Sequence, residues 1–184
     1  MNQELEFLEV ESYLDPETFE PLVKIEFNGK KLLITSTAAT QKAIAIINAA
    51  AYAESEGALF KALAPDIPKG FGKPSKDVQM AVAVLKLVRE KRQPLPVDVN
   101  AIFGFNTQKP LIQIDYQEFK TTLHLDEARN HAAVLLQASE AARFDAFWFK
   151  FGKELNMTEG EIQAVINEYR VYKERYSVEA LFRL

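Results

Sequence analysis

Hydrophobic and polar residues alternate along two short segments of the chain that lie 89 residues apart. Val23, Ile25 and Phe27 alternate with polar residues, and residues 112–116 repeat the pattern. A period of two with β-branched and aromatic residues predicts a strand that buries one face. Residues 31–35 follow the first segment as a return strand, so a β-hairpin is predicted there, and the similar second segment predicts another.

The two predicted hairpins differ at their turns. Asn28-Gly29 predicts a two-residue type I′ turn in the first. The second has Gln117-Glu118, and because these residues adopt positive φ less readily than Gly, we expect a different turn type. An extended segment, 5–14 or 97–105, precedes each hairpin and joins it through residues typical of turns. Each half of the chain therefore predicts a three-stranded antiparallel meander.

A long, unusually apolar helix is predicted after each meander. The two helices are expected near 38–63 and 127–154, with Thr37 and Asp126 as N-caps. Because a helix that is apolar around its circumference must be covered on several sides, we expect each to contact both a sheet and another helix.

Five aromatic residues crowd the end of the second long helix. We expect this cluster to anchor the core of the second half, with an exposed binding surface as the alternative. The residues are Phe144, Phe147, Trp148, Phe149 and Phe151.

A shorter amphipathic helix is predicted to complete each half. These helices are expected near 75–92 and 158–176, with Ser75 and Thr158 as caps, the latter in a capping box. The linker 93–96 contains two prolines, which block continuation of the first short helix.

The two halves also resemble each other in sequence. Residues 21–61 align with 110–150 without a gap, and ten of the 41 pairs are identical. Other pairs keep their physical character, among them Glu56 and Asp145. A second stretch aligns at an offset of 84, which makes the intervening loop five residues shorter in the second half. Similar composition of two hairpins and two helices is the alternative explanation.

These patterns together predict an α+β fold with an internal duplication of a βββαα unit. Its antiparallel meander sheets are expected to pack on the long apolar helices with pseudo-twofold symmetry. The repeats are assigned to 1–93 and 97–184 and are expected to pack together as one globular unit, because so apolar a half would be poorly soluble alone.

Composition narrows the functional classes. The chain has 184 residues, 48% of them hydrophobic and 26% charged, and no cysteine, which excludes disulfides, thiol catalysis and thiolate metal sites. No apolar run approaches the ~20 residues of a membrane span, and the N-terminus has no signal-peptide pattern. We therefore expect a soluble cytoplasmic protein that does not enter a membrane.

A search for catalytic chemistry finds no motif. The two histidines, His124 and His131, lack the spacing that places a metal-binding pair on one helical face. There is no nucleotide-binding fingerprint, and the glycine-containing segment 70–76 is interrupted by proline. These observations favour a protein that is not an enzyme and uses no cofactor or metal.

Charge is distributed unevenly along the chain. Residues 65–93 carry a local charge of +4, whereas the whole chain carries −4. We interpret the basic side chains as a candidate anion or partner patch, with ordinary solvated surface as the alternative. The patch comprises Lys69, Lys73, Lys76, Lys86, Arg89, Lys91 and Arg92.

The function predicted first is a non-enzymatic interaction or regulatory module that binds a second copy of itself, as a homodimer, or another protein. A small-ligand binder in the cleft between the repeats is one alternative. Another is single-stranded nucleic-acid binding by sheet aromatics and the basic region 65–93. In arrangement only, the duplicated halves resemble the Whirly and PUR-type binders, which use four strands per repeat instead of three. Nucleic acid is disfavoured because the strands carry acidic rather than basic residues beside their aromatics.

Overall fold

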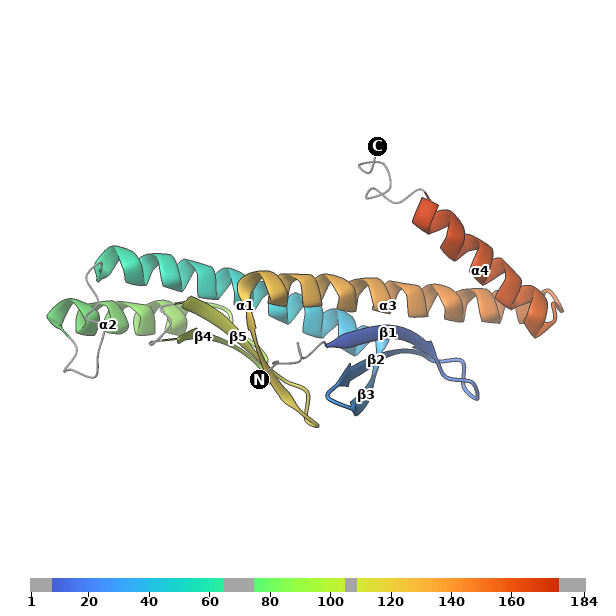
Figure 1. The fold of residues 1–184 in the computed structure, drawn as a ribbon, viewed down its shortest axis with the longest axis horizontal. Coiled ribbons are helices and arrows are strands. Elements are labelled where there is room, and N and C mark those ends of the chain that lie inside the picture. Colours follow the sequence, from blue (N-terminus) through green and yellow to red (C-terminus); the bar gives the residue numbers. More distant parts are fainter. Residues whose placement is uncertain (1–7, 65–74, 105–108, 176–184) are drawn as a thin grey trace, which may run out of the picture.

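A computed structural model describes residues 8–64, 75–104 and 109–175, and Figure 1 shows its fold. Strands and helices follow one another in the order βββααβββαα. The first half contains β1 (Glu9–Leu14), β2 (Pro21–Phe27), β3 (Lys30–Thr35), α1 (Ser36–Leu63) and α2 (Lys76–Lys91). The second half contains β4 (Val99–Gly104), β5 (Lys109–Asp115), β6 (Lys120–His124), α3 (Leu125–Glu154) and α4 (Glu159–Arg175).

The strands form two separate three-stranded antiparallel sheets, ordered β1-β2-β3 and β4-β5-β6. Together with the four helices they confirm the predicted α+β class. The pairing registers of the sheets are related by one offset of 89 residues. Leu14 pairs with Pro21 as Phe103 pairs with Pro110, and the other pairs of the second sheet follow the same rule.

The hairpin turns differ as expected. Asn28 and Gly29 both have positive φ, 50° and 75°, as a type I′ turn requires. In the second hairpin Gln117 has a φ of 69° and the Glu118 N–H donates to the Tyr116 carbonyl at 2.8 Å. A positive φ at the centre of an i to i+2 hydrogen bond is the geometry of a γ-turn, which requires one left-handed residue instead of two.

Both long helices begin two residues earlier than predicted. The N-caps are Thr35 and His124 and not Thr37 and Asp126, because the last residue of the preceding strand already has the extended backbone that a cap needs. The Thr35 hydroxyl accepts a backbone N–H of the first turn at 3.2 Å. At His124 the backbone N–H donates to the Glu127 carboxylate at 2.8 Å. Strand and helix are therefore joined without a loop.

The long helices run in opposite directions and lie side by side over their N-terminal halves (Figure 1). Each helix then extends over the sheet of the other half. As a result, α1 packs mainly against β4 and β5, and α3 mainly against β1 and β2. The expectation that each helix contacts a sheet and a helix is confirmed, but the sheet belongs to the opposite half.

The main core consists of the inner faces of both sheets and the facing sides of α1 and α3. Val23 and Ile25 from β2 and Ile112 and Ile114 from β5 are completely buried. The helices contribute many small residues to this core, because alanine lets two helix backbones and a sheet approach closely. They include Ala39, Ala43, Ala49, Ala50, Ala128, Ala132 and Ala138.

The short helices pack differently at the two ends of the molecule. Helix α2 folds back along α1 after a twelve-residue connector, whereas α4 leaves α3 at an angle after four residues (Figure 1). Ser75 caps α2 as predicted, and the capping box of α4 forms between Thr158 and Glu161. Near the end of α3, Gly152 faces the buried Ile162 of α4 so closely that a β-carbon on Gly152 would lie 2.4 Å from it. Within the described ranges, no helix has the length and apolar character needed to cross a membrane.

Candidate functional site

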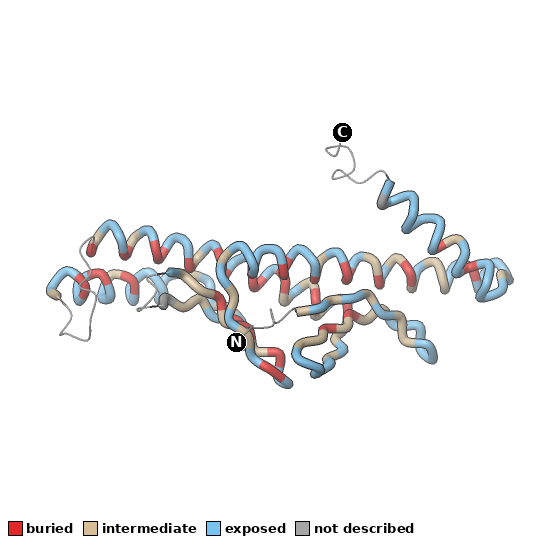
Figure 2. Tube along the Cα trace, in the orientation of Figure 1, coloured by how far each residue is buried: buried red, intermediate tan, exposed pale blue. Residues whose placement is uncertain are grey.

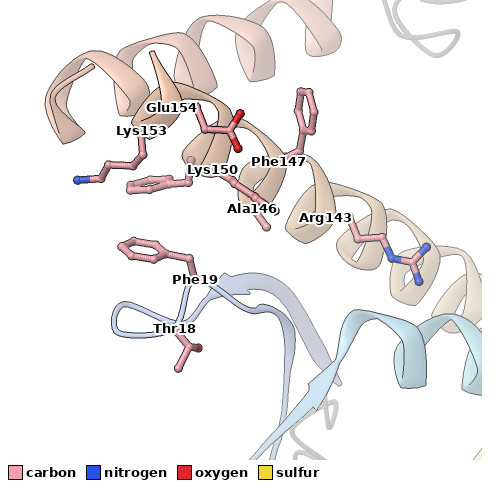
Figure 3. Close-up of a pocket in the computed structure, with 9 residues that line it drawn as sticks. Thr18, Phe19, Arg143, Ala146, Phe147, Lys150, Lys153 and Glu154 are labelled. Carbon is pink, nitrogen blue, oxygen red and sulfur yellow. The ribbon is translucent and has the colours of Figure 1, made fainter. Parts of the chain in front are cut away.

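A groove lies between the turn that joins β1 to β2 and the C-terminal half of α3 (Figure 3). Its volume is about 700 Å³. The turn belongs to the first half of the chain and the helix to the second, so the groove lies between the two. The lining residues are Thr18, Phe19, Arg143, Ala146, Phe147, Phe149, Lys150, Lys153 and Glu154.

The turn holds Phe19 in an unusual backbone conformation. The Asp15 carboxylate accepts the backbone N–H groups of Glu17 and Thr18 at 2.9 and 2.8 Å, which holds the pKa of Asp15 below its ordinary value. The Phe19 N–H donates to the Asp15 carbonyl at 2.9 Å, and Phe19 has a left-handed φ of 56°. This φ is uncommon for a bulky residue. It presents the ring to α3, where it stacks on Phe149 with centroids 5.1 Å apart.

Three basic residues of α3 border the groove. Arg143 lies at one end and Lys153 at the other, with Lys150 between them (Figure 3). Lys153 pairs with Glu159 at 2.9 Å, but Arg143 donates only to neutral groups, the hydroxyls of Ser36 and Thr40. Over the described residues, neither Arg143 nor Lys150 forms an ion pair with a carboxylate.

Glu154 is the acidic residue among those lining the groove. Because it is a single carboxylate beside Arg143 and Lys150, and because Lys153 is already paired, the groove combines an apolar wall with an excess of positive charge.

The groove continues into an apolar surface that we call the aromatic stripe, defined by Phe147, Phe151 and Leu155. Phe147 is 59% exposed and Phe151 39% exposed, and their rings stack with centroids 5.8 Å apart. Figure 2 shows how much of α4 and of this end of α3 is open to solvent. The prediction that the five clustered aromatics form a buried core is therefore wrong: none of them is fully buried, because α4 diverges and covers only one side of α3.

Trp148 lies against the aromatic stripe. Its ring meets Phe147 and Phe151 edge-to-face, with centroids 5.9 and 5.8 Å apart. Its indole Nε1 is buried and has no hydrogen-bond partner among the described atoms. An unpaired buried N–H costs about 1–3 kcal/mol, so this end of α3 is not optimised for stability.

The seven residues of the predicted basic patch have different surroundings where the structure describes them. Lys76, Lys86 and Lys91 are exposed on α2, whereas Lys69 and Lys73 lie outside the described residues. Arg89 and Arg92 instead pair with the carboxylate of Glu56, which is buried under α2.

Glu56 contacts both arginines through its carboxylate. The Arg89 Nε lies 3.0 Å from Glu56, and this hydrogen bond holds the pKa of Arg89 above its ordinary value. Arg92 also lies over the Tyr52 ring, 4.6 Å from its centroid. Two of the seven predicted cations thus neutralise an internal acid.

A related buried acid occurs in the second half. Asp145 stands 89 residues after Glu56 and pairs with Arg170 of α4. Burial raises the pKa of Asp145, although Arg170 opposes that shift. Each long helix is therefore tied to its following short helix by a buried acid and arginine.

The histidines serve the fold. His131 is buried and hydrogen-bonded to the Tyr116 hydroxyl; burial, helped by the charge of Lys42, lowers the pKa of His131 to about 4. His124 is the exposed cap of α3. Within the described residues no group of three metal-ligating side chains converges.

No family model, curated protein or solved structure matches this chain. The sequence offered a cleft between the halves as an alternative but not the residues that line it, because Phe19 and Phe149 lie 130 residues apart and only the fold brings them together. One signal was available: the aligned halves place alanines, Ala58 and Ala62, opposite Phe147 and Phe151. Large aromatic residues in one half at positions where the other half has alanine indicate a property that only one half possesses.

Proposed function

We propose that this chain is a non-enzymatic interaction module, built from two copies of a βββαα unit, that associates with a second copy of itself. The duplication is supported by the common offset of 89 residues in sequence, strand register and the N-caps of the long helices.

Contacts between the halves support a pseudo-twofold relation of the two units. Arg143 donates to the Thr40 hydroxyl at 3.3 Å, and Arg129 pairs with Glu54. An offset of 89 converts Thr40 into Arg129 and Glu54 into Arg143. A twofold axis requires such reciprocal contacts, in which equivalent positions exchange partners.

The observation that carries the proposed self-association is an uncovered apolar surface on the paired long helices. Ile44 is 50% exposed, and Ile47 and Val134 are also exposed, although they belong to the two most apolar helices. Among residues 8–64, 75–104 and 109–175, neither the sheets nor the opposite helix covers these side chains. In a symmetric dimer the same surface would face its own copy, which requires no other partner.

Sedimentation velocity of the full chain over a range of concentrations tests this proposal. We expect reversible dimerisation, and we expect Ile44→Asp to abolish it, because dimerisation would bury an unpaired charge. Leu33→Asp is the matched control, because Leu33 is equally exposed but lies on a sheet. A wild-type chain that stays monomeric at high concentration contradicts self-association and leaves the duplication untouched.

A second candidate function, small-ligand binding between the halves, is favoured by the groove. Its volume of about 700 Å³ falls within the range of about 300–1,000 Å³ usual for ligand pockets. Its three phenylalanines beside a few charged groups are also typical of such pockets.

Single-stranded nucleic-acid binding has less support. The exposed Tyr13 lies on the same strand as Glu9 and Glu11, and Lys24 on the neighbouring strand pairs with Glu11 and Glu26. Basic side chains that are already paired to acids do not provide the cationic track on which such binding depends.

A further inference from the structure

We propose that the groove binds an amphiphilic organic anion, a small molecule with an apolar body and a single acidic head group. This inference rests on the second candidate function, small-ligand binding, and adds the chemical class of the ligand. The apolar body would lie along Phe19, Phe149 and Phe147, and the head group would be held by Arg143 or Lys150.

The apolar wall determines the body of the ligand. Phe19 and Phe149 stack across the groove, and Ala146 and Phe147 line the same space from α3. Phe147 is more than half exposed, so water contacts an aromatic face that an apolar ligand would cover. Because the side chains on this wall offer few uncharged hydrogen-bonding groups, an uncharged polar ligand would lose its hydration without replacement.

The charge at the groove determines the head group. Arg143 and Lys150 lack carboxylate partners over the described part of the chain, and they flank the apolar wall on the same face of α3. The Arg143 guanidinium already donates from Nε and Nη2 to the Ser36 and Thr40 hydroxyls, so its remaining N–H groups would bind a carboxylate or phosphate beside the Lys150 ammonium. The chain as a whole carries −4, so this positive charge runs against the general charge of the molecule.

The dimensions of the groove favour a small molecule over a macromolecule. A volume of about 700 Å³ accommodates a compact ligand, whereas a stable protein interface usually requires about 800 Å² on each partner. A ligand with one acidic end matches the few cations present. A polyanion would meet Glu154, which lies on the same wall.

Three probes with the same ten-carbon chain test the assignment on the full-length protein: decanoate, decanol and decyltrimethylammonium, each below its micellar concentration. Isothermal titration gives the affinities, and emission of the single tryptophan, Trp148, reports on the groove wall through its contact with Phe147. We expect saturable one-to-one binding of decanoate, about tenfold tighter than that of decanol, and the weakest binding for the cation.

Charge-reversed variants locate the head group. Lys150→Glu should weaken decanoate binding about tenfold and leave decanol binding unchanged. Lys61→Glu is the matched control, because Lys61 is the equivalent exposed lysine of α1 and should have no effect. Phe19→Ala should weaken decanoate and decanol together, since it removes one side of the apolar wall. Circular dichroism confirms that each variant is folded.

The possible results distinguish failure of the proposed ligand class, an amphiphilic anion, from failure of small-ligand binding in the groove. Equal binding of decanoate and decanol that is insensitive to Lys150→Glu overturns the anionic head group but leaves small-ligand binding in place. Tightest binding of the ammonium probe also overturns it. If no probe binds, or if binding survives Phe19→Ala unchanged, the groove is not a site for such molecules and small-ligand binding there is wrong.

Discussion

The two halves of the chain contain the same elements in the same order, but their short helices pack differently at the two ends of the molecule. At the first end α2 lies along α1 and buries Phe60 against Val78, Ala81 and Leu85. At the second end α4 diverges from α3, and the equivalent Phe149 stacks instead on a turn from the other half. One end is closed by its own short helix, whereas the other leaves aromatic surface and a groove open.

The two ends also differ in their exposed side chains. Ala58 and Ala62 on α1 correspond to Phe147 and Phe151 on α3, and all four are exposed. Because these side chains are not buried, packing of the core does not explain why phenylalanine stands at two of the positions. A large aromatic side chain on a surface where alanine suffices is more readily explained by binding than by stability.

The largest expected effect concerns the buried acids that tie the short helices in place. Glu56→Ala should lower the free energy of unfolding by about 3–4 kcal/mol, because it leaves two arginines without their shared partner under α2. Asp145→Ala should cost only about 1–2 kcal/mol, since a single arginine that is half exposed loses its partner. Urea denaturation monitored by circular dichroism measures both.

Glu54→Ala serves as the control for this pair of variants. Its exposed ion pair with Arg129 should be worth less than about 1 kcal/mol. Equal costs for Glu56→Ala and Asp145→Ala would contradict the view that the first end is the more firmly closed.

A somewhat smaller effect is expected from pH, and it arises from His131. Its pKa is about 4 in the folded chain and about 6.5 when unfolded, so the unfolded state binds more protons between these values. The contribution of neutral His131 to the free energy of unfolding should therefore be fully present above pH 6.5. It should decrease as the pH falls towards 4, by up to about 3 kcal/mol.

His131→Gln tests the origin of this pH dependence, because its amide keeps an acceptor for the Tyr116 hydroxyl but does not titrate. Stability measured by urea denaturation at a series of pH values should decrease less steeply for this variant. Asp145 acts in the opposite sense, since its raised pKa favours the folded state as the pH falls. Identical slopes for the variant and the wild type would exclude His131 as the cause.

The smallest effect is expected at the junction of α3 and α4. Gly152→Ala places a β-carbon 2.4 Å from Ile162 Cγ1, so α4 must shift, at a cost of about 1–3 kcal/mol. Hydrogen exchange of the α4 amides should accelerate while exchange at the α1–α3 contact stays slow.

Gly160→Ala is the natural comparison, because open space surrounds a β-carbon at that position. It should be neutral or slightly stabilising, since alanine is the better helix former. If both glycine variants behave alike, close packing against Ile162 does not hold α4.

Local signals in the sequence were sufficient for the elements and their order. Alternation gave the strands, Ser75 and Thr158 capped the short helices as expected, and Asn28-Gly29 formed the expected turn. Each of these features depends on residues within a few positions of one another, which is why they could be read without knowing the fold.

Features that depend on distant residues were not predictable in this way. Nothing in the sequence indicated that α1 would pack on β4 and β5, because helix and sheet faces are apolar whichever partner they meet. The ion pairs of Arg89 and Arg92 likewise depend on Glu56, which lies more than thirty positions away in the sequence. The groove required a turn and a helix from opposite halves, so its existence was a property of the tertiary arrangement.

The crossed packing of helices and sheets has a consequence for how this polypeptide can be divided. Cutting it in the connector between α2 and β4 would yield two fragments, each with a helix made to cover the other's strands. Neither fragment would possess a complete interior, so folding and mutual recognition would be a single event. If the halves arose by the duplication proposed above, a single-unit ancestor would by the same reasoning have been an obligate exchanged dimer, and joining two units in one gene would have fixed its stoichiometry.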